Sequence, residues 1–238
     1  MTLLEARSTT FSGALLWDLD GTILSTAKAG RIALRGAVLE IVGKDADYAD
    51  LQTAGLTDAE VTASVLRSVG VLPTPELLAR VAEEYERRLP DALLLRQGFV
   101  LPGVREALDG LAARRRVVSL LTTGNTRAGA NAKLARYGIA DRFPYGGAFC
   151  EGDLSRSDIV ARAVVLATRL LDGAHGAQLV LIGDTPLDVA CAQQAGIRAI
   201  GVATGSHSAE QLSLAGAWLV LDRIPDSVEL EGLVLEGR

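Results

Sequence analysis

The chain has 238 residues, of which 49% are hydrophobic and 22% charged, a composition typical of soluble globular proteins that argues against intrinsic disorder. The 24 basic residues against 29 acidic ones give a net charge of −5, which argues against a nucleic-acid-binding surface. The longest apolar runs, such as Ala217–Leu221, are far shorter than the ~20 residues of a membrane-spanning helix, and no signal-peptide pattern precedes Asp18. Two cysteines and two histidines are too few for a disulfide scaffold or a Cys/His zinc site. We therefore expect a cytoplasmic protein, with neither a nucleic-acid nor a membrane partner.

Short apolar runs alternate with helical patterns along most of the chain. The runs lack polar alternation, which is typical of strands covered on both faces. They are Ala14–Trp17, Val117–Leu121, Leu179–Ile182, Ala199–Ala203 and Trp218–Leu221. Between them, stripes such as Ile159, Ala163 and Leu166 indicate helices. This alternation predicts an α/β fold with a Rossmann-like parallel sheet.

Residues 25–97, between the first and second strands, show helical stripes and no convincing strand. Val61, Val65 and Val69 mark one stripe, and Thr74-Pro75 is typical of an N-cap followed by proline at the first helical position. We predict three or four helices here, forming an all-helical cap domain (25–97) inserted into a core domain of residues 1–24 and 98–238. We expect the last dozen residues to be loosely held.

Two acidic motifs follow predicted strands. The first is Asp18-Leu19-Asp20-Gly21-Thr22, and because ligands bind at the carboxyl ends of strands in such sheets, its two aspartates are candidates for a site. Crowded carboxylates repel each other unless a cation or a shared proton relieves them, although Asp-Gly is also common in solvated turns. The second is Gly183-Asp184-Thr185-Pro186-Leu187-Asp188, and carboxylates from neighbouring strand ends would suit Mg²⁺. The alternative is that Asp184 or Thr185 only caps the next helix and Asp188 only complements its dipole.

A third motif, Thr122-Thr123-Gly124-Asn125-Thr126, leads from a strand into a helix. Hydroxyls and free amides at a helix N-terminus can bind phosphate, although such N-caps are common. Together the three motifs resemble the haloacid dehalogenase-like hydrolase superfamily, specifically its phosphatases of the phosphoglycolate phosphatase type with a helical cap after the first motif. Asp18–Thr22 looks like motif one, Thr123 like motif two and Gly183–Asp188 like motif four. The resemblance covers almost the whole chain and implies a hydrolase acting on phosphoric monoesters.

The resemblance also implies roles for individual residues. Asp18 would be the nucleophile and carry a phospho-aspartyl intermediate, and Asp20 would be the general acid and base. Mg²⁺ would be held by Asp18, the backbone carbonyl of Asp20 and Asp184, with Asp188 orienting this metal shell. The phosphoryl oxygens would be bound by the second motif: Thr123, Gly124 and Asn125.

Motif three departs from the family pattern, which usually places a lysine ahead of a helix. The only lysine after the second motif is Lys133, seven residues beyond Thr126 and about 10 Å along the same helix from the phosphate-binding end. We therefore interpret Lys133 as an exposed helix residue and expect Lys133→Ala to be nearly silent. Arg156 is the better candidate for both catalysis and phosphate binding, because arginine supplies a permanent, planar, bidentate charge.

The expected substrate is a small phosphorylated metabolite, of the phosphoglycolate or sugar-phosphate type. Leu56, in the predicted cap turn, offers no anchor for a second anion, which argues against phosphoglycolate itself. Two alternatives are a phosphomutase of the β-phosphoglucomutase type, with the same aspartates, and a non-catalytic phosphate-binding regulatory module. Either a monomer or a homodimer is compatible with the sequence.

Overall fold

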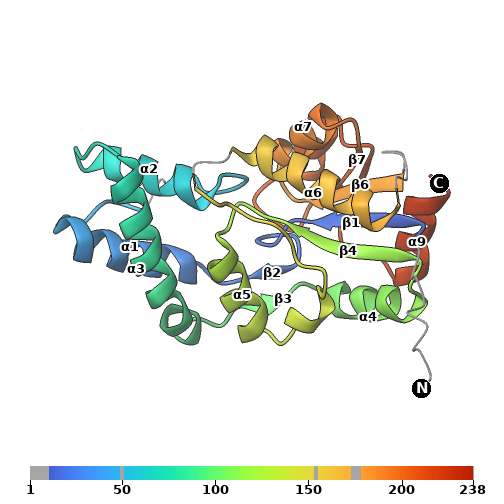
Figure 1. The fold of residues 1–238 in the computed structure, drawn as a ribbon, viewed down its shortest axis with the longest axis horizontal. Helices are drawn as coiled ribbons and strands as arrows, with labels where there is room; N and C mark the ends of the chain where they lie inside the picture. Colours follow the sequence, from blue (N-terminus) through green and yellow to red (C-terminus); the bar gives the residue numbers. More distant parts are fainter. Residues whose placement is uncertain (1–10, 49–50, 153–154, 173–177, 238) are drawn as a thin grey trace, which may run out of the picture.

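The core of the protein is a six-stranded sheet. The computed structural model describes residues 11–48, 51–152, 155–172 and 178–237. Its six strands run parallel in the order β5-β4-β1-β6-β7-β8, with helices around them (Figure 1). They are β1 (Gly13–Trp17), β4 (Val117–Thr122), β5 (Gly147–Ala148), β6 (Leu179–Gly183), β7 (Arg198–Val202) and β8 (Leu219–Leu221). The predicted α/β fold with a parallel sheet is confirmed.

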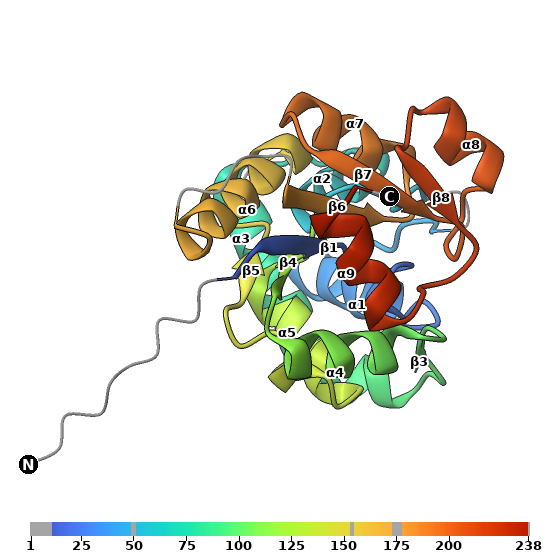
Figure 2. The same cartoon turned by 90° about the vertical axis from the view of Figure 1, so that its right-hand side faces the viewer.

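Helices cover both faces of this sheet (Figure 2). The helices α6 (Arg156–Leu170) and α7 (Pro186–Gln194) pack on one face, and α4 (Val104–Arg114) and α9 (Ser227–Leu235) pack on the other. All of β1 is buried, and its side chains alternate between two hydrophobic clusters: Leu15 and Trp17 in one, Ala14 and Leu16 in the other. Burying a side chain such as leucine contributes about 1.5–3 kcal/mol. The strand that carries the first acidic motif is therefore held firmly from both sides.

Most of the last dozen residues form a packed helix, α9, so the expectation that they are loosely held was wrong for the described residues 227–237. Helix α9 buries Leu230, Leu233 and Val234 and packs against α4 and β1. These apolar residues are spaced i, i+3, i+4, a pattern typical of one buried helix face. This spacing of apolar residues could be seen in the sequence, although the helix has only nine residues.

Between β1 and α4 the chain forms three helices that lie together on the side of the molecule away from α9 (Figure 1). They are α1 (Ala29–Val42), α2 (Asp58–Ser68) and α3 (Pro75–Leu94), and α1 packs along α3. The side chain of Thr74 accepts a hydrogen bond from the amide of Leu77, with Pro75 at the first helical position, as predicted. Two short antiparallel strands that we did not predict, β2 (Leu24–Ser25) and β3 (Phe99–Val100), pair where the chain leaves and re-enters the core. We propose that residues 25–97 are a separate cap domain, and we use the name cap for them below.

The remaining elements are short or lie near the site. They are α5 (Arg127–Arg136), a 3₁₀ helix (Ala140–Arg142) and α8 (Ala209–Leu214). In the part of the chain that the structure describes, no helix has both the length and the apolar character needed to span a membrane.

Candidate active site

The three motifs meet at the carboxyl edge of the sheet. Trp17, the last residue of β1, is in register with Leu121 of β4 and Ile182 of β6. The residues that follow these positions therefore come together, and they include Asp18, Thr123 and Asp184. All three line a cavity of about 300 Å³ whose other wall is formed by the cap.

Three carboxylates form the centre of the site. Asp18, Asp184 and Asp188 are buried, and each offers a ligand oxygen within 4.8 Å of the others. Burial raises the pKa of Asp18 to about 7 and that of Asp184 to about 8, and mutual repulsion adds to both shifts, while Arg156 opposes the shift at Asp18. A group of this kind keeps its full charge at neutral pH only when a cation is close.

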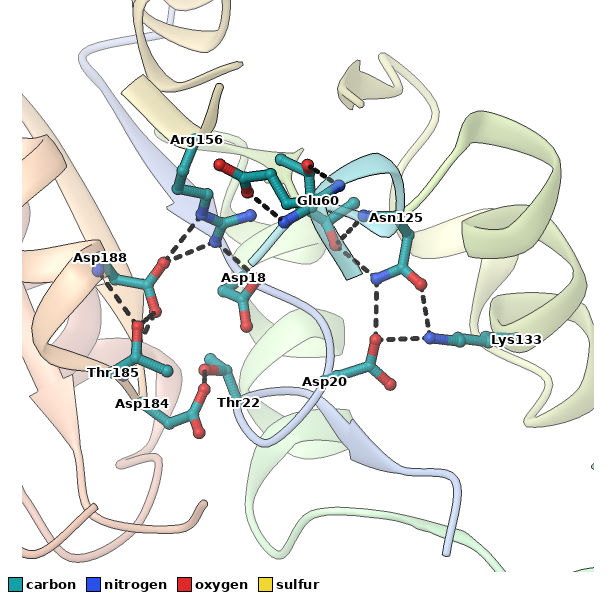
Figure 3. A network of polar contacts seen from close by, with 12 residues as sticks. Asp18, Asp20, Thr22, Glu60, Asn125, Lys133, Arg156, Asp184, Thr185 and Asp188 are labelled. Atoms are coloured by element: carbon teal, nitrogen blue, oxygen red, sulfur yellow. Dashed lines mark hydrogen bonds and ion pairs between the residues drawn. The ribbon is translucent and has the colours of Figure 1, made fainter. Parts of the chain in front are cut away.

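Arg156 supplies one such cation. It is the first residue of α6, whose N-terminus is fixed by a capping box between Ser155 and Asp158. Its guanidinium donates to Asp18 Oδ1 at 2.7 Å and to Asp188 Oδ1 at 2.6 and 3.1 Å (Figure 3). Burial alone would lower the pKa of Arg156, but the charges of Asp188 and Asp18 outweigh it and raise the pKa above its usual value. The structure thus places Arg156 beside the candidate nucleophile.

Asp188 takes part in two arrangements at once. Its Oδ1 accepts from Arg156, while its Oδ2 accepts from the hydroxyl of Thr185 at 2.7 Å and from the amide of Thr185 at 3.2 Å. Thr185 is the N-cap of α7, so the capping that we considered as the alternative does occur. The same carboxylate also accepts from Arg156, so taking part in the helix cap leaves Asp188 free to contact the site, and its role beside a metal stays a prediction.

Lys133 lies inside the site, so its interpretation as an exposed helix residue was wrong. Its side chain is 5% exposed, and its Nζ donates to Asp20 Oδ2 and to Asn125 Oδ1, both at 2.5 Å (Figure 3). The interpretation considered only the rise of the helix axis. Side chains on a helix point toward its N-terminus, so the four-carbon stem of Lys133 spans the turns that separate it from Asn125.

Asn125 completes this second group of contacts. Its Nδ2 donates to Asp20 Oδ2 and to Thr123 Oγ1, both at 2.7 Å, and its side chain is buried. Asn125 and Lys133 therefore hold Asp20 from the side of the second motif. The sequence suggested Asn125 as a phosphate ligand and gave no signal that its amide would orient Asp20.

Asp184 differs from the other carboxylates because no lysine or arginine in the described part of the chain lies within ion-pair distance of it. The hydroxyl of Thr22 donates to Asp184 Oδ1 at 3.3 Å. A Cβ atom on Gly205 would lie 1.7 Å from Asp184 Oδ2, and one on Gly21 would lie 2.4 Å away. The backbone at Gly21 and Gly205 therefore approaches this carboxylate too closely to leave room for a side chain at either position.

The donor set fits a divalent metal ion. Asp18, Asp20, Asp184 and Asp188 face two cations, Arg156 and Lys133, so the site lacks two positive charges when all four carboxylates are ionised. Hard cations such as Mg²⁺ prefer carboxylate and carbonyl oxygens. One divalent ion near Asp18 and Asp184 would balance the cluster.

Other candidates from the sequence lie elsewhere. His207 is in a loop beside Ser206, and His175 lies outside the described residues. Cys150 and Cys191 are buried, as expected of small apolar fillers. The sequence also gave no sign that the cap residue Asp58 would reach the second motif.

Residues 15–193, well over half of the chain, match the family model of the haloacid dehalogenase-like hydrolases. The chain belongs to this family, and within it is a phosphatase-type hydrolase similar to the phosphoglycolate phosphatases. It is 28% identical over 227 residues to a Dickeya dadantii protein named probable phosphatase IndB (90% of this chain, 91% of the relative). It is 27% identical to phosphoglycolate phosphatase of Synechococcus elongatus (85% of this chain, 89% of the relative).

Solved structures share the fold. A CbbY variant from Rhodobacter sphaeroides, crystallised with xylulose-1,5-bisphosphate, superposes with a TM-score of 0.70 at 22% identity. The alignment covers 89% of this chain and 94% of CbbY. At this level of identity the likeness concerns the fold.

Proposed function

We propose that the protein is a Mg²⁺-dependent phosphatase that hydrolyses a small phosphate monoester through a phospho-aspartyl intermediate on Asp18. The observation that carries this proposal is the charge arrangement at the carboxyl edge of the sheet. Asp18 is buried beside Arg156, and Asp184 next to it has no ion-pair partner among the described residues. A binding-only phosphate site would not gain from a group of buried carboxylates, whereas nucleophilic attack and metal binding both require them.

In the first step a carboxylate oxygen of Asp18 attacks phosphorus and the bond between phosphorus and the ester oxygen breaks. Asp20 donates its proton to the leaving alkoxide as that bond breaks. Arg156 and the amides after Thr123 stabilise the charge on the phosphoryl oxygens. The products of this step are the free alcohol and an acyl phosphate on Asp18.

In the second step water attacks the phosphorus of the acyl phosphate and gives a proton to Asp20. The bond between phosphorus and the Asp18 oxygen breaks, and inorganic phosphate leaves. The metal would be held by Asp18, the backbone carbonyl of Asp20 and Asp184. When bound, it shields the repulsion between the nucleophile and the dianionic phosphate.

The cavity supports the proposal of a small substrate. About 300 Å³ suits a small metabolite, and the cap contributes apolar side chains to the wall, among them Leu34, Leu56 and Val61. The guanidinium of Arg31 donates hydrogen bonds to the backbone carbonyls of Tyr48 and Leu51, at 3.3 and 2.9 Å. We propose a small phosphate monoester of the phosphoglycolate or sugar-phosphate type as the substrate, and the ester panel below distinguishes the two.

The test is phosphate release from a panel of small monoesters, including 2-phosphoglycolate and several sugar phosphates, with and without Mg²⁺. The wild type is compared with Asp18→Asn, which keeps the shape of the side chain and removes the nucleophile. Metal-dependent release that is lost in Asp18→Asn supports the proposal. Isomerisation of a sugar phosphate without release points instead to a phosphomutase, and folded protein that binds phosphate without turnover points to a regulatory module.

A further inference from the structure

Asp58, at the start of the cap helix α2, makes two hydrogen bonds to the loop 123–126 of the second motif. The backbone N–H of Asp58 donates to the carbonyl of Gly124 at 2.7 Å, and the backbone N–H of Thr126 donates to Asp58 Oδ2 at 2.9 Å. These two hydrogen bonds hold the loop 123–126 on both sides of Asn125. Asn125 in turn orients Asp20, so a residue of the cap is connected to the candidate general acid through one loop.

Asp58 is not needed to begin its own helix. The N-cap of α2 is Thr57, whose side chain accepts from the amide of Glu60, and a carboxylate oxygen of Glu60 accepts from the amide of Thr57 at 2.8 Å. Figure 3 shows Glu60 beside the site, between Arg156 and Asn125 in this view. Because this capping box satisfies the helix start, the carboxylate of Asp58 is available to the loop in the core.

Close packing at two glycines also indicates that the cap turn before α2 is docked on the core. A Cβ atom on Gly124 would lie 2.5 Å from the carbonyl oxygen of Leu56 and 2.9 Å from Cα of Thr57. On the opposite side of the turn, a Cβ atom on Gly55 would lie 2.9 Å from Thr185 Oγ1. The turn at the start of α2 therefore fits between the second and fourth motifs, and Gly124 permits the cap to approach.

We propose that Asp58 is a positioning residue that fixes the loop 123–126 in its phosphate-binding arrangement when the cap is docked. The amides that would receive the phosphoryl group are then pre-organised only in the closed enzyme. This inference rests on the proposed phosphatase function. Replacing Asp58 by alanine removes the hydrogen bond from the Thr126 amide to the carboxylate and leaves the backbone hydrogen bond to Gly124 in place. Loss of a hydrogen bond to a charged group, in a loop that acts in the transition state, predicts an effect of about 10- to 100-fold on kcat/KM.

The test compares Asp58→Ala with Asp58→Asn and with Asp91→Asn, a matched control on an exposed part of the cap helix α3. We measure kcat and KM with the best ester of the panel, binding of inorganic phosphate by calorimetry, and the unfolding midpoint. Asp58→Ala should lose about 10- to 100-fold in kcat/KM and bind phosphate more weakly. Asp58→Asn should retain most of the activity, because its amide oxygen can accept from Thr126, and Asp91→Asn should match the wild type.

Gly124→Ala gives a second perturbation of the same docking, because its methyl group would push the cap turn away. Its loss and the loss from Asp58→Ala should not add in the double variant, since both act through one contact. Wild-type kcat/KM and phosphate binding in Asp58→Ala would overturn the inference while leaving the phosphatase proposal intact, as would equal losses in Asp58→Asn and Asp58→Ala. If the wild type releases no phosphate, the proposed function fails, and the calorimetric comparison of phosphate binding still tests Asp58.

Discussion

Replacing Lys133 by methionine tests the most unexpected feature of the site. Methionine keeps the length and packing of the lysine stem and removes the ammonium that contacts Asp20 and Asn125. Removing one partner of a fully buried ion pair costs about 3–5 kcal/mol, whereas exposed pairs contribute about 0–1 kcal/mol. The Lys133 side chain is 5% exposed and that of Asp20 is 40% exposed. We therefore expect Lys133→Met to lower the free energy of unfolding by an intermediate amount, about 1–3 kcal/mol.

The same change should lower kcat by about 10- to 100-fold, because Asp20 keeps only the Asn125 amide to orient it. Urea unfolding in the absence of metal gives the stability, and phosphate release at saturating ester gives kcat. The matched control is Lys44→Met, since Lys44 is exposed and its Nζ donates to the carbonyl of Val69 away from the site. Lys44→Met should change stability by less than about 0.5 kcal/mol.

A thermodynamic cycle separates the ion pair from general packing. If the Lys133–Asp20 contact carries the effect, Lys133→Met should be much less destabilising in an Asp20→Asn background, with a coupling energy of about 0.5–2 kcal/mol. Wild-type stability and wild-type kcat in Lys133→Met would refute the reasoning and restore the interpretation of Lys133 as a silent helix residue.

Further predictions concern the carboxylates and their neighbours. Arg156→Ala should destabilise the fold by about 3–5 kcal/mol in denaturant titrations, because it leaves Asp18 and Asp188 buried without their cation, and it should abolish most turnover. Burial and repulsion raise the pKa of Asp184 from 3.8 to about 8, so folded metal-free protein holds a proton that the unfolded chain releases, and its stability should fall as the pH rises from 4 to 8. Asp184→Asn should flatten this dependence and stabilise the metal-free protein at pH 8 by about 1–3 kcal/mol, and a pH-independent difference would contradict it. Gly205→Ala, whose methyl would lie 1.7 Å from Asp184 Oδ2, should weaken Mg²⁺ binding in calorimetry, whereas Gly43→Ala, with open space around it, should not.

Features that depend on local pattern could be predicted from the sequence. The five strands that we predicted all occur, because unbroken apolar runs have few alternatives to a doubly covered sheet. Placement of Asp18, Thr123 and Asp184 followed from their position after three such strands, since parallel strands end at one edge. Arg156 was predicted from the resemblance to the family's third motif, and it is the first residue of α6 and donates to Asp18.

Features that depend on side-chain direction and on docking could not be predicted in the same way. Lys133 has a sequence position that fits an exposed helix residue, and only the tilt of its side chain toward the N-terminus of α5 brings it to Asp20. The contact of Asp58 with Gly124 and Thr126 depends on how the cap meets the core, and hydrophobic periodicity carries no information about that approach. The strands β2 and β3 have two residues each and are too short to give a period.

The two cations of the site are chemically different, and their geometry explains why. Arg156 must contact Asp18 and Asp188 together, and two of its nitrogens do so from one planar group. Lys133 contacts Asp20 and Asn125 with one ammonium at the end of a flexible four-carbon stem. Both acceptors are bonded by this one nitrogen, so the contact does not require the planar guanidinium of an arginine. The position of Asp188 gives the guanidinium of Arg156 a second carboxylate to bind besides Asp18. On this argument, Arg156→Lys should preserve the charge next to Asp18 but lose one of these contacts, so that it falls between the wild type and Arg156→Ala in both stability and turnover.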